Sequence, residues 1–176
     1  MTRRHRFLRL AVTGIACVAC LAALGADLPQ RKAGQWQITT TTDDSKLPPR
    51  VEDVCLDQAT SALLDKFALG ASQKMCSTFD WKSLGSGRAS VDASCKLGAT
   101  QMTIHGETVF DGNSAYRETV KTHFEPPLRG RSDSTSVRDG KWSGPCAGDM
   151  NPGDIVTRPS STMPMAIRMN LNEMLK

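Results

Sequence analysis

The sequence predicts a mainly β protein, an antiparallel meander that forms a curved sheet or a partly closed barrel. The chain is rich in turn formers, with 14 Gly and 9 Pro in 176 residues, which favours many short strands over a helical bundle. Stretches of alternating apolar and polar residues are separated by Gly, Asp, Asn and Pro, as in strands joined by tight turns. Only two segments predict helices, one after the second strand and one near the C-terminus.

A basic and then apolar segment opens the chain. Residues 2–9 carry the charges, residues 10–25 are uncharged, and small residues follow up to Ala26. This pattern is typical of a secretory signal peptide, which predicts removal of residues 1–26 and export to the periplasm. A lipoprotein or an uncleaved anchor is the less favoured alternative. Cys17 and Cys20 lie inside the apolar segment, and its 16 residues would reach only about 24 Å as a helix.

The charge balance excludes one class of partner. The chain holds 22 Lys and Arg against 18 Asp and Glu. Arg3, Arg4, Arg6 and Arg9 precede the first acidic residue, Asp27, so 18 basic and 18 acidic residues remain from there on. A domain without net charge is not expected to bind nucleic acid.

The first elements after the signal are two strands and a helix. Trp36 and Ile38 alternate with polar residues over 34–42, and a second strand follows over 50–56. The stretch 57–68 predicts a short amphipathic helix. In that helix Asp57 is the N-cap, Ala59, Leu63 and Phe67 form the apolar stripe, and Gly70 marks the end.

The remaining strands are expected near 76–83, 88–96, 100–110, 114–124, 130–138 and 141–145. Matching of apolar faces places Phe110 opposite Tyr116 across the turn around Gly112. Asp139-Gly140 has the composition of a two-residue hairpin turn, which would place Val137 opposite Trp142.

Four cysteines follow the signal, and an even number in an exported chain predicts two disulfides. Cys76 and Cys95 are equally far from the turn at 84–87, but the apolar faces of their strands match only if the register shifts by one residue. We therefore prefer Cys55–Cys76 with Cys95–Cys146. The second choice is Cys76–Cys95 with Cys55–Cys146, which needs a bulge to restore the register.

Short motifs in this order resemble the exported bacterial family called domain of unknown function 3617. They are Gly34-Gln35-Trp36-Gln37-Ile38-Thr39, Val54-Cys55-Leu56 before a helix, the pair Cys76 and Cys95, and Gly144-Pro145-Cys146. The resemblance covers roughly residues 33–146 and implies a periplasmic, β-rich protein without an assigned activity. The domain is thus expected over 27–146, and the present chain continues some thirty residues further.

Two His-x-Glu pairs are the candidates for chemistry. His105 with Glu107 and His123 with Glu125 fall on successive strands, and the register above places His105 opposite Lys121 and His123 opposite Thr103. Imidazole and carboxylate groups could bind a metal or act as acid and base. The preferred interpretation is a solvated polar face of the sheet, with no catalytic residue and no cofactor.

The tail, residues 147–176, predicts a flexible linker and then a Met-rich amphipathic helix over 164–175, separate from the domain. Met163, Met165 and Met169 have spacings that could hold Cu(I), but the apolar stripe of a docking helix is the preferred explanation.

The functional hypothesis is an exported, non-enzymatic protein that binds a small apolar ligand or an envelope component. A hydrolase or metal-dependent enzyme that uses the histidine pairs, and a Cu(I)-handling protein that uses the methionines, are the alternatives.

Overall fold

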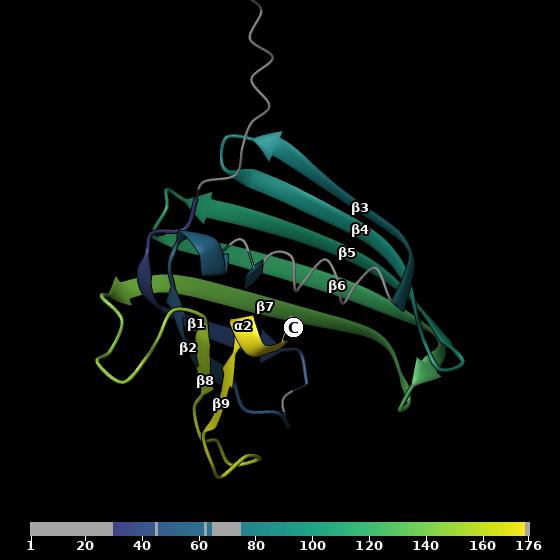
Figure 1. Ribbon diagram of the computed structural model, residues 1–176. Coiled ribbons are helices and arrows are strands. Elements are labelled where there is room, and N and C mark those ends of the chain that lie inside the picture. The colour runs from purple at the N-terminus through teal and green to yellow at the C-terminus, as the bar shows by residue number, and fades with distance from the viewer. Residues whose placement is uncertain (1–29, 45, 62, 65–74, 175–176) are drawn as a thin grey trace, which may run out of the picture.

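A computed structural model describes residues 30–44, 46–61, 63–64 and 75–174. Most of this part of the chain forms one antiparallel sheet (Figure 1), with the strand order β3-β4-β5-β6-β7-β1-β2-β8-β9. The strands are β1 Gly34–Thr42, β2 Arg50–Leu56, β3 Cys76–Gly85, β4 Arg88–Leu97, β5 Thr100–Asp111, β6 Ala115–Leu128, β7 Arg131–Gly144, β8 Asp154–Thr157 and β9 Ile167–Asn170. Helix α2 is Leu171–Met174, and residues 58–61 and 63–64 are also helical.

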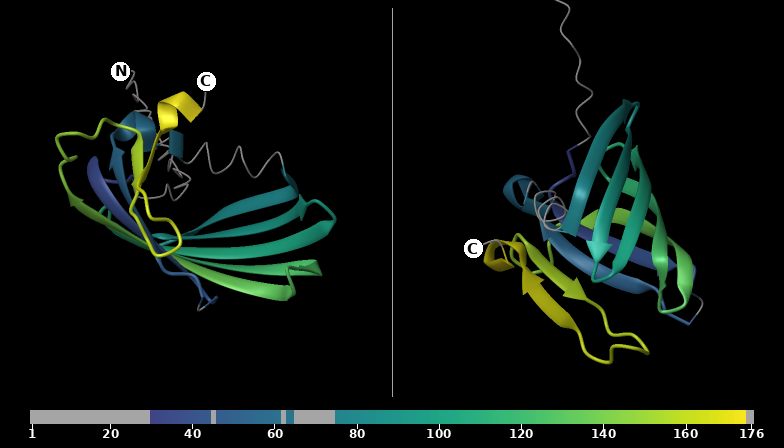
Figure 2. Two further views of the ribbon diagram at one scale, coloured as in Figure 1. Left: turned by 90° about the horizontal axis from the view of Figure 1, so that it is seen from below. Right: turned by 90° about the vertical axis from the view of Figure 1, so that its right-hand side faces the viewer.

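The sheet bends into a gutter that stays open between its two edge strands, β3 and β9 (Figure 2). Strands β3 to β7 follow one another as neighbours, and β7 then pairs with β1. The predicted mainly β, curved antiparallel meander is therefore confirmed.

The hydrophobic core lies at one end of the gutter, between the sheet and the described helical segments (Figure 2). Its buried members come from three strands and from α2: Trp36, Ile38, Val54, Leu56, Ile155 and Leu171. Leu64, Tyr116, Trp142 and Met169 pack against this cluster. Because Leu171 and Leu64 reach the cluster from the concave side, that side is the core side of β1 and β2.

Asp57 begins the first helical segment, as predicted. The Thr60 N–H donates to Asp57 Oδ1 at 2.7 Å, and the Asp57 N–H donates to Thr60 Oγ1 at 2.9 Å, so two of the free N–H groups at the helix start are satisfied. Ala59, the first residue of the predicted stripe, is exposed, whereas Thr60 is buried and Leu64 packs against the core. Phe67 and Gly70 lie outside the described residues.

The two disulfides are Cys55–Cys146 and Cys76–Cys95, so the preferred pairing of Cys55 with Cys76 and of Cys95 with Cys146 is wrong. The matching of apolar faces was right, because Phe79 lies opposite Ala93. An irregularity between Cys76 and Thr78 shifts the register by one residue and returns Cys76 to a position opposite Cys95.

The tail belongs to the sheet, and the prediction of a linker over 147–162 with a helix over 164–175 is wrong. Strand β8 pairs with β2, and β9 pairs with β8. Among the described residues of the tail, only 171–174 are helical. The tail instead forms two short strands and one helical turn, and Ile155 of β8 and Leu171 of α2 are buried in the core.

The predicted turn at Asp139-Gly140 is also wrong, because β7 runs through it without a break. Gly140 lies between Ile38 on β1 and Tyr116 on β6. A Cβ atom at this position would overlap the ring of Tyr116, so Gly140 makes room for an aromatic side chain.

The predicted signal peptide, residues 1–26, lies outside the described residues. Within the described part of the chain, no helix is long and apolar enough to cross a membrane.

Gly140→Ala should lower the free energy of unfolding by about 1–3 kcal/mol, because the added methyl group must displace the Tyr116 ring in a packed core. Gly148→Ala is the control, since a Cβ there would meet open space. Urea denaturation of both variants measures the difference, and equal stabilities would show that Gly140 does not accommodate the ring.

Leu171→Ala should cost about 2–5 kcal/mol, since Leu171 is fully buried and its truncation leaves a cavity in the core. Met174→Ala, at an exposed position of the same helix, should change the stability little. If thermal or urea unfolding shows no loss for Leu171→Ala, the tail is a separable addition after all.

Candidate functional site on the concave face

The strand registers identify which residues of each strand lie on the concave face of the sheet. On β1 it is marked by Trp36 and Ile38, whose partners on β7 are Trp142 and Gly140. Gly140 pairs in turn with Tyr116 on β6. Because directly paired residues share a face, the even-numbered residues of β5 to β7 and the odd-numbered residues of β3 and β4 lie on the concave side.

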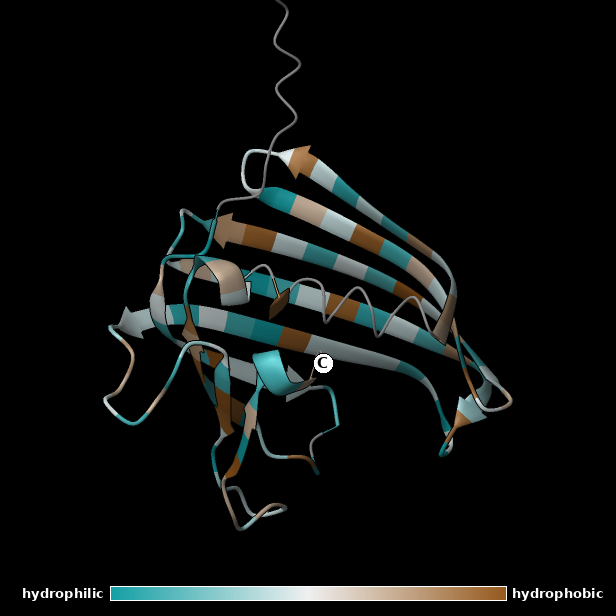
Figure 3. Ribbon diagram, in the orientation of Figure 1, coloured by the Kyte–Doolittle hydropathy of each residue, from teal (hydrophilic) through white to brown (hydrophobic). Residues whose placement is uncertain are grey.

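Apolar side chains fill this face over β3 to β6. They are Phe79, Trp81, Val91, Ala93, Met102, Ile104, Phe110, Val120 and Phe124. Figure 3 shows the resulting alternation of apolar and polar residues along these strands. Most members are half-buried, and Trp81 is 46% exposed. The described helical segments lie over the other end of the gutter (Figure 2), so the described part of the chain leaves this apolar surface accessible.

The convex face of the same strands is polar and charged. Its exposed members include Lys82, Arg88, Asp92, Lys96, His105, Glu107, Arg117, Lys121, His123 and Asp133. A sheet with one solvated face shows this division. The difference between the faces marks the concave side as the one suited to an apolar ligand.

Two ion pairs interrupt the apolar character where the core meets the open half of the face. Arg138 Nη1 lies 3.1 Å from Glu118 Oε2, and Arg50 Nη2 lies 3.1 Å from Glu52 Oε2. Burial of the neighbouring Tyr116 raises the pKa of its phenol. The sequence reasoning missed these inward charges, although Glu118 and Arg138 have the same even numbering as the apolar residues of their strands.

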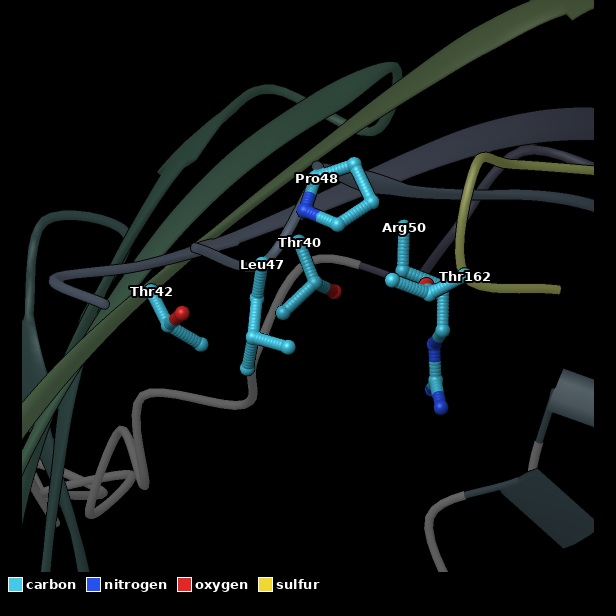
Figure 4. Close-up of a pocket in the computed structure, with 6 residues that line it drawn as sticks. All are labelled: Thr40, Thr42, Leu47, Pro48, Arg50 and Thr162. Carbon is cyan, nitrogen blue, oxygen red and sulfur yellow. The ribbon is translucent and has the colours of Figure 1, made fainter. Parts of the chain in front are cut away.

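A depression of about 310 Å³ is lined in part by Arg50, the arginine of the second ion pair. It is lined by Thr40, Thr42, Leu47, Pro48, Arg50 and Thr162, which come from β1, the loop before β2, the start of β2 and the loop after β8. Figure 4 shows Thr42 and Arg50 at opposite ends, with Thr40 and Leu47 between them. The lining combines one guanidinium, three hydroxyl groups and apolar carbon.

The predicted histidine pairs lie on the convex face, away from these features. His105 pairs with Lys121 and His123 pairs with Thr103 in the sheet, which confirms the predicted register. His105 Nδ1 lies 2.7 Å from Asp92 Oδ1. In the same way, His123 Nδ1 lies 2.9 Å from Asp133 Oδ1.

The glutamates of the two His-x-Glu pairs behave differently. Glu107 lies 3.7 Å from His105 Nε2, whereas Glu125 makes no ion pair with His123 among the contacts of the described residues. No group of three His, Cys, Asp or Glu side chains suited to a metal ion occurs in the described part of the chain.

The three tail methionines have different surroundings. Met163 forms an isolated bridge with Ser160, Met165 is 75% exposed, and Met169 packs against the core. Because residues 167–170 are a strand, the helical spacing that would have brought Met165 and Met169 together does not exist.

Asp92→Asn should lower the pKa of His105 towards its ordinary value of 6.5, because the hydrogen bond to Asp92 is the main cause that raises it. The folded pKa is the higher one, so the pair stabilises the fold below about pH 6.5 and loses this effect as the pH rises through the folded pKa. NMR titration of the His105 ring measures the shift. Asp133→Asn is the control, and an unchanged His105 titration in Asp92→Asn would contradict the assignment.

Comparison with known proteins places the chain in a family. No curated protein and no solved structure matches it. Residues 31–146 match the family described as Protein of unknown function (DUF3617). This match spans β1 to β7 and both disulfides, while β8, β9 and α2 lie beyond it. The chain belongs to the DUF3617 family.

Proposed function

We propose that this protein is exported and acts without catalysis, as a binding protein for a small apolar ligand that lies on the concave face of its sheet. The observation that carries the proposal is the contrast between the two faces of β3 to β6, apolar on the concave side and charged on the convex side. Export is supported by the apolar segment at residues 10–25 and by the two disulfides, which persist in oxidising compartments.

The curvature of the sheet gives the apolar face the concave shape that a ligand site needs. Ligand sites are concave and mostly apolar, with a few polar groups that fix the orientation of the ligand. The gutter supplies the concavity, and the ion pairs of Arg138 and Arg50 supply polar groups at one side of the apolar surface. An accessible apolar surface of this kind marks a site of interaction in soluble proteins.

Trp81→Glu should weaken binding of the neutral apolar dye N-phenyl-1-naphthylamine by about tenfold or more, because it replaces an aromatic contact with a carboxylate that the dye would desolvate. Trp81 is already 46% exposed, so the fold should tolerate the change. The dye is titrated into protein that has been purified from its host with both disulfides intact, and the dye fluorescence is measured.

Val109→Glu is the matched control, since Val109 is 50% exposed and lies on the convex face. His105→Ala combined with His123→Ala should also leave dye binding unchanged. Failure of the unmodified protein to bind the dye, or equal loss in Trp81→Glu and Val109→Glu, would refute a concave binding site.

A further inference from the structure

Two arginines flank one threonine on the concave face. Thr40 pairs with Arg50 on β2 and with Arg138 on β7, so the three side chains share a face in one row across the sheet. Neighbouring strands are about 4.8 Å apart, and Thr40 on β1 lies between the two arginine positions in this row. Two members of the row, Thr40 and Arg50, line the depression (Figure 4).

The side chains of this row have hydrogen-bonding groups without a partner among the described residues. Thr40 Oγ1 is buried and has no hydrogen-bond partner among the described residues. Arg50 and Arg138 each donate from one nitrogen to a glutamate, whereas a guanidinium carries five N–H donors. Arg50 is 56% exposed and Arg138 45% exposed, so their remaining donors are accessible to a ligand.

The chemistry of the row selects an anionic oxygen. Guanidinium groups bind carboxylate and phosphate through paired N–H donors, and a hydroxyl group can donate a further hydrogen bond. Without such a ligand, a buried hydroxyl group that has no partner is unfavourable.

The registers relate the depression to the apolar half of the face. Thr42 pairs with Ser136 on β7, which pairs with Val120 on β6, and Val120 pairs with Gly106 on β5. The apolar surface therefore begins two strands away from the depression. Five strand spacings separate β1 from β3, about 24 Å in all, which is enough to seat a long acyl chain.

We infer that the ligand is an amphiphile whose carboxylate or phosphate head group is held by Arg50, Arg138 and Thr40, while its hydrocarbon chain lies across β6 to β3. This inference deepens the proposed function and depends on it. The head group would enter the depression, and Leu47 and Pro48 would contact the first carbons of the chain.

Competition against bound N-phenyl-1-naphthylamine tests the head group. Dodecanoate, dodecyl phosphate and 1-dodecanol share one chain and differ in the group at its end. Both anions should displace the dye at concentrations about 10- to 100-fold lower than the alcohol, as charge-assisted hydrogen bonds imply. The stronger of the two anions identifies the head group as carboxylate or phosphate. Equal competition by the anions and the alcohol would overturn the inference.

Arg50→Gln should remove about tenfold of the dodecanoate affinity and lower the 1-dodecanol and dye affinities far less, because neither of these ligands carries an anionic group. Arg117→Gln is the matched control, because Arg117 pairs with Asp139 on the convex face. If both variants respond alike, the depression does not hold the head group.

Thr40→Val is a second variant for the case in which Arg50→Gln destabilises the protein by leaving Glu52 without its arginine. The change removes a hydroxyl group that lacks a partner, so the unliganded protein should be as stable as before or more stable. Its affinity for dodecanoate should nevertheless fall severalfold. An unchanged dodecanoate affinity would contradict the role of Thr40.

The outcomes separate the two proposals. Loss of dye binding in the unmodified protein would refute the concave site itself. Retained dye binding without discrimination between dodecanoate and 1-dodecanol would refute only the head-group site.

Discussion

A single curved sheet has to cover one apolar face, and the rest of the structure depends on how it does so. Side chains alternate between the two sides of a strand, and the registers gather most of the apolar ones of β3 to β6, β1 and β2 on the concave side. At one end the described helical segments meet that side and close a core around Trp36 and Leu171. At the other end, within the described residues, the face remains accessible. The same alternation thus accounts for the core and for the binding surface.

The closed end is held by covalent and by packing interactions between segments far apart in the chain. The Cys55–Cys146 disulfide joins β2 to the segment that follows β7, and β8 then returns to pair with β2. A disulfide of this kind restricts the unfolded chain, and longer loops gain more. Leu171 completes the core from beyond the family match. These contacts connect β2, β7, β8 and α2 at that end of the gutter.

Alternation was sufficient to predict β1 to β6, their faces and the pairing of Phe110 with Tyr116, but it divided β7 at Asp139-Gly140 and missed β8 and β9. It could not locate the irregularity between Cys76 and Thr78, because one extra residue in a strand leaves no pattern in the sequence, and the disulfide pairing depends on it. It also could not distinguish a glycine in a turn from a glycine beneath a ring, which is the case at Gly140. The candidate site was missed for a related reason. In the sequence, Glu118 and Arg138 cannot be distinguished from other charged residues of their strands. Only the registers place them in one row with Arg50 of β2.

The central claim is that the concave face holds an amphiphile in the protein's native compartment. Native mass spectrometry of the protein isolated from that compartment tests it most directly, because the ligand is retained without having been chosen by the experimenter. The account predicts one anionic amphiphile per chain, which Trp81→Glu loses and Val109→Glu keeps. A chain that carries no ligand in any of these forms, or one whose ligand survives Trp81→Glu, would contradict it.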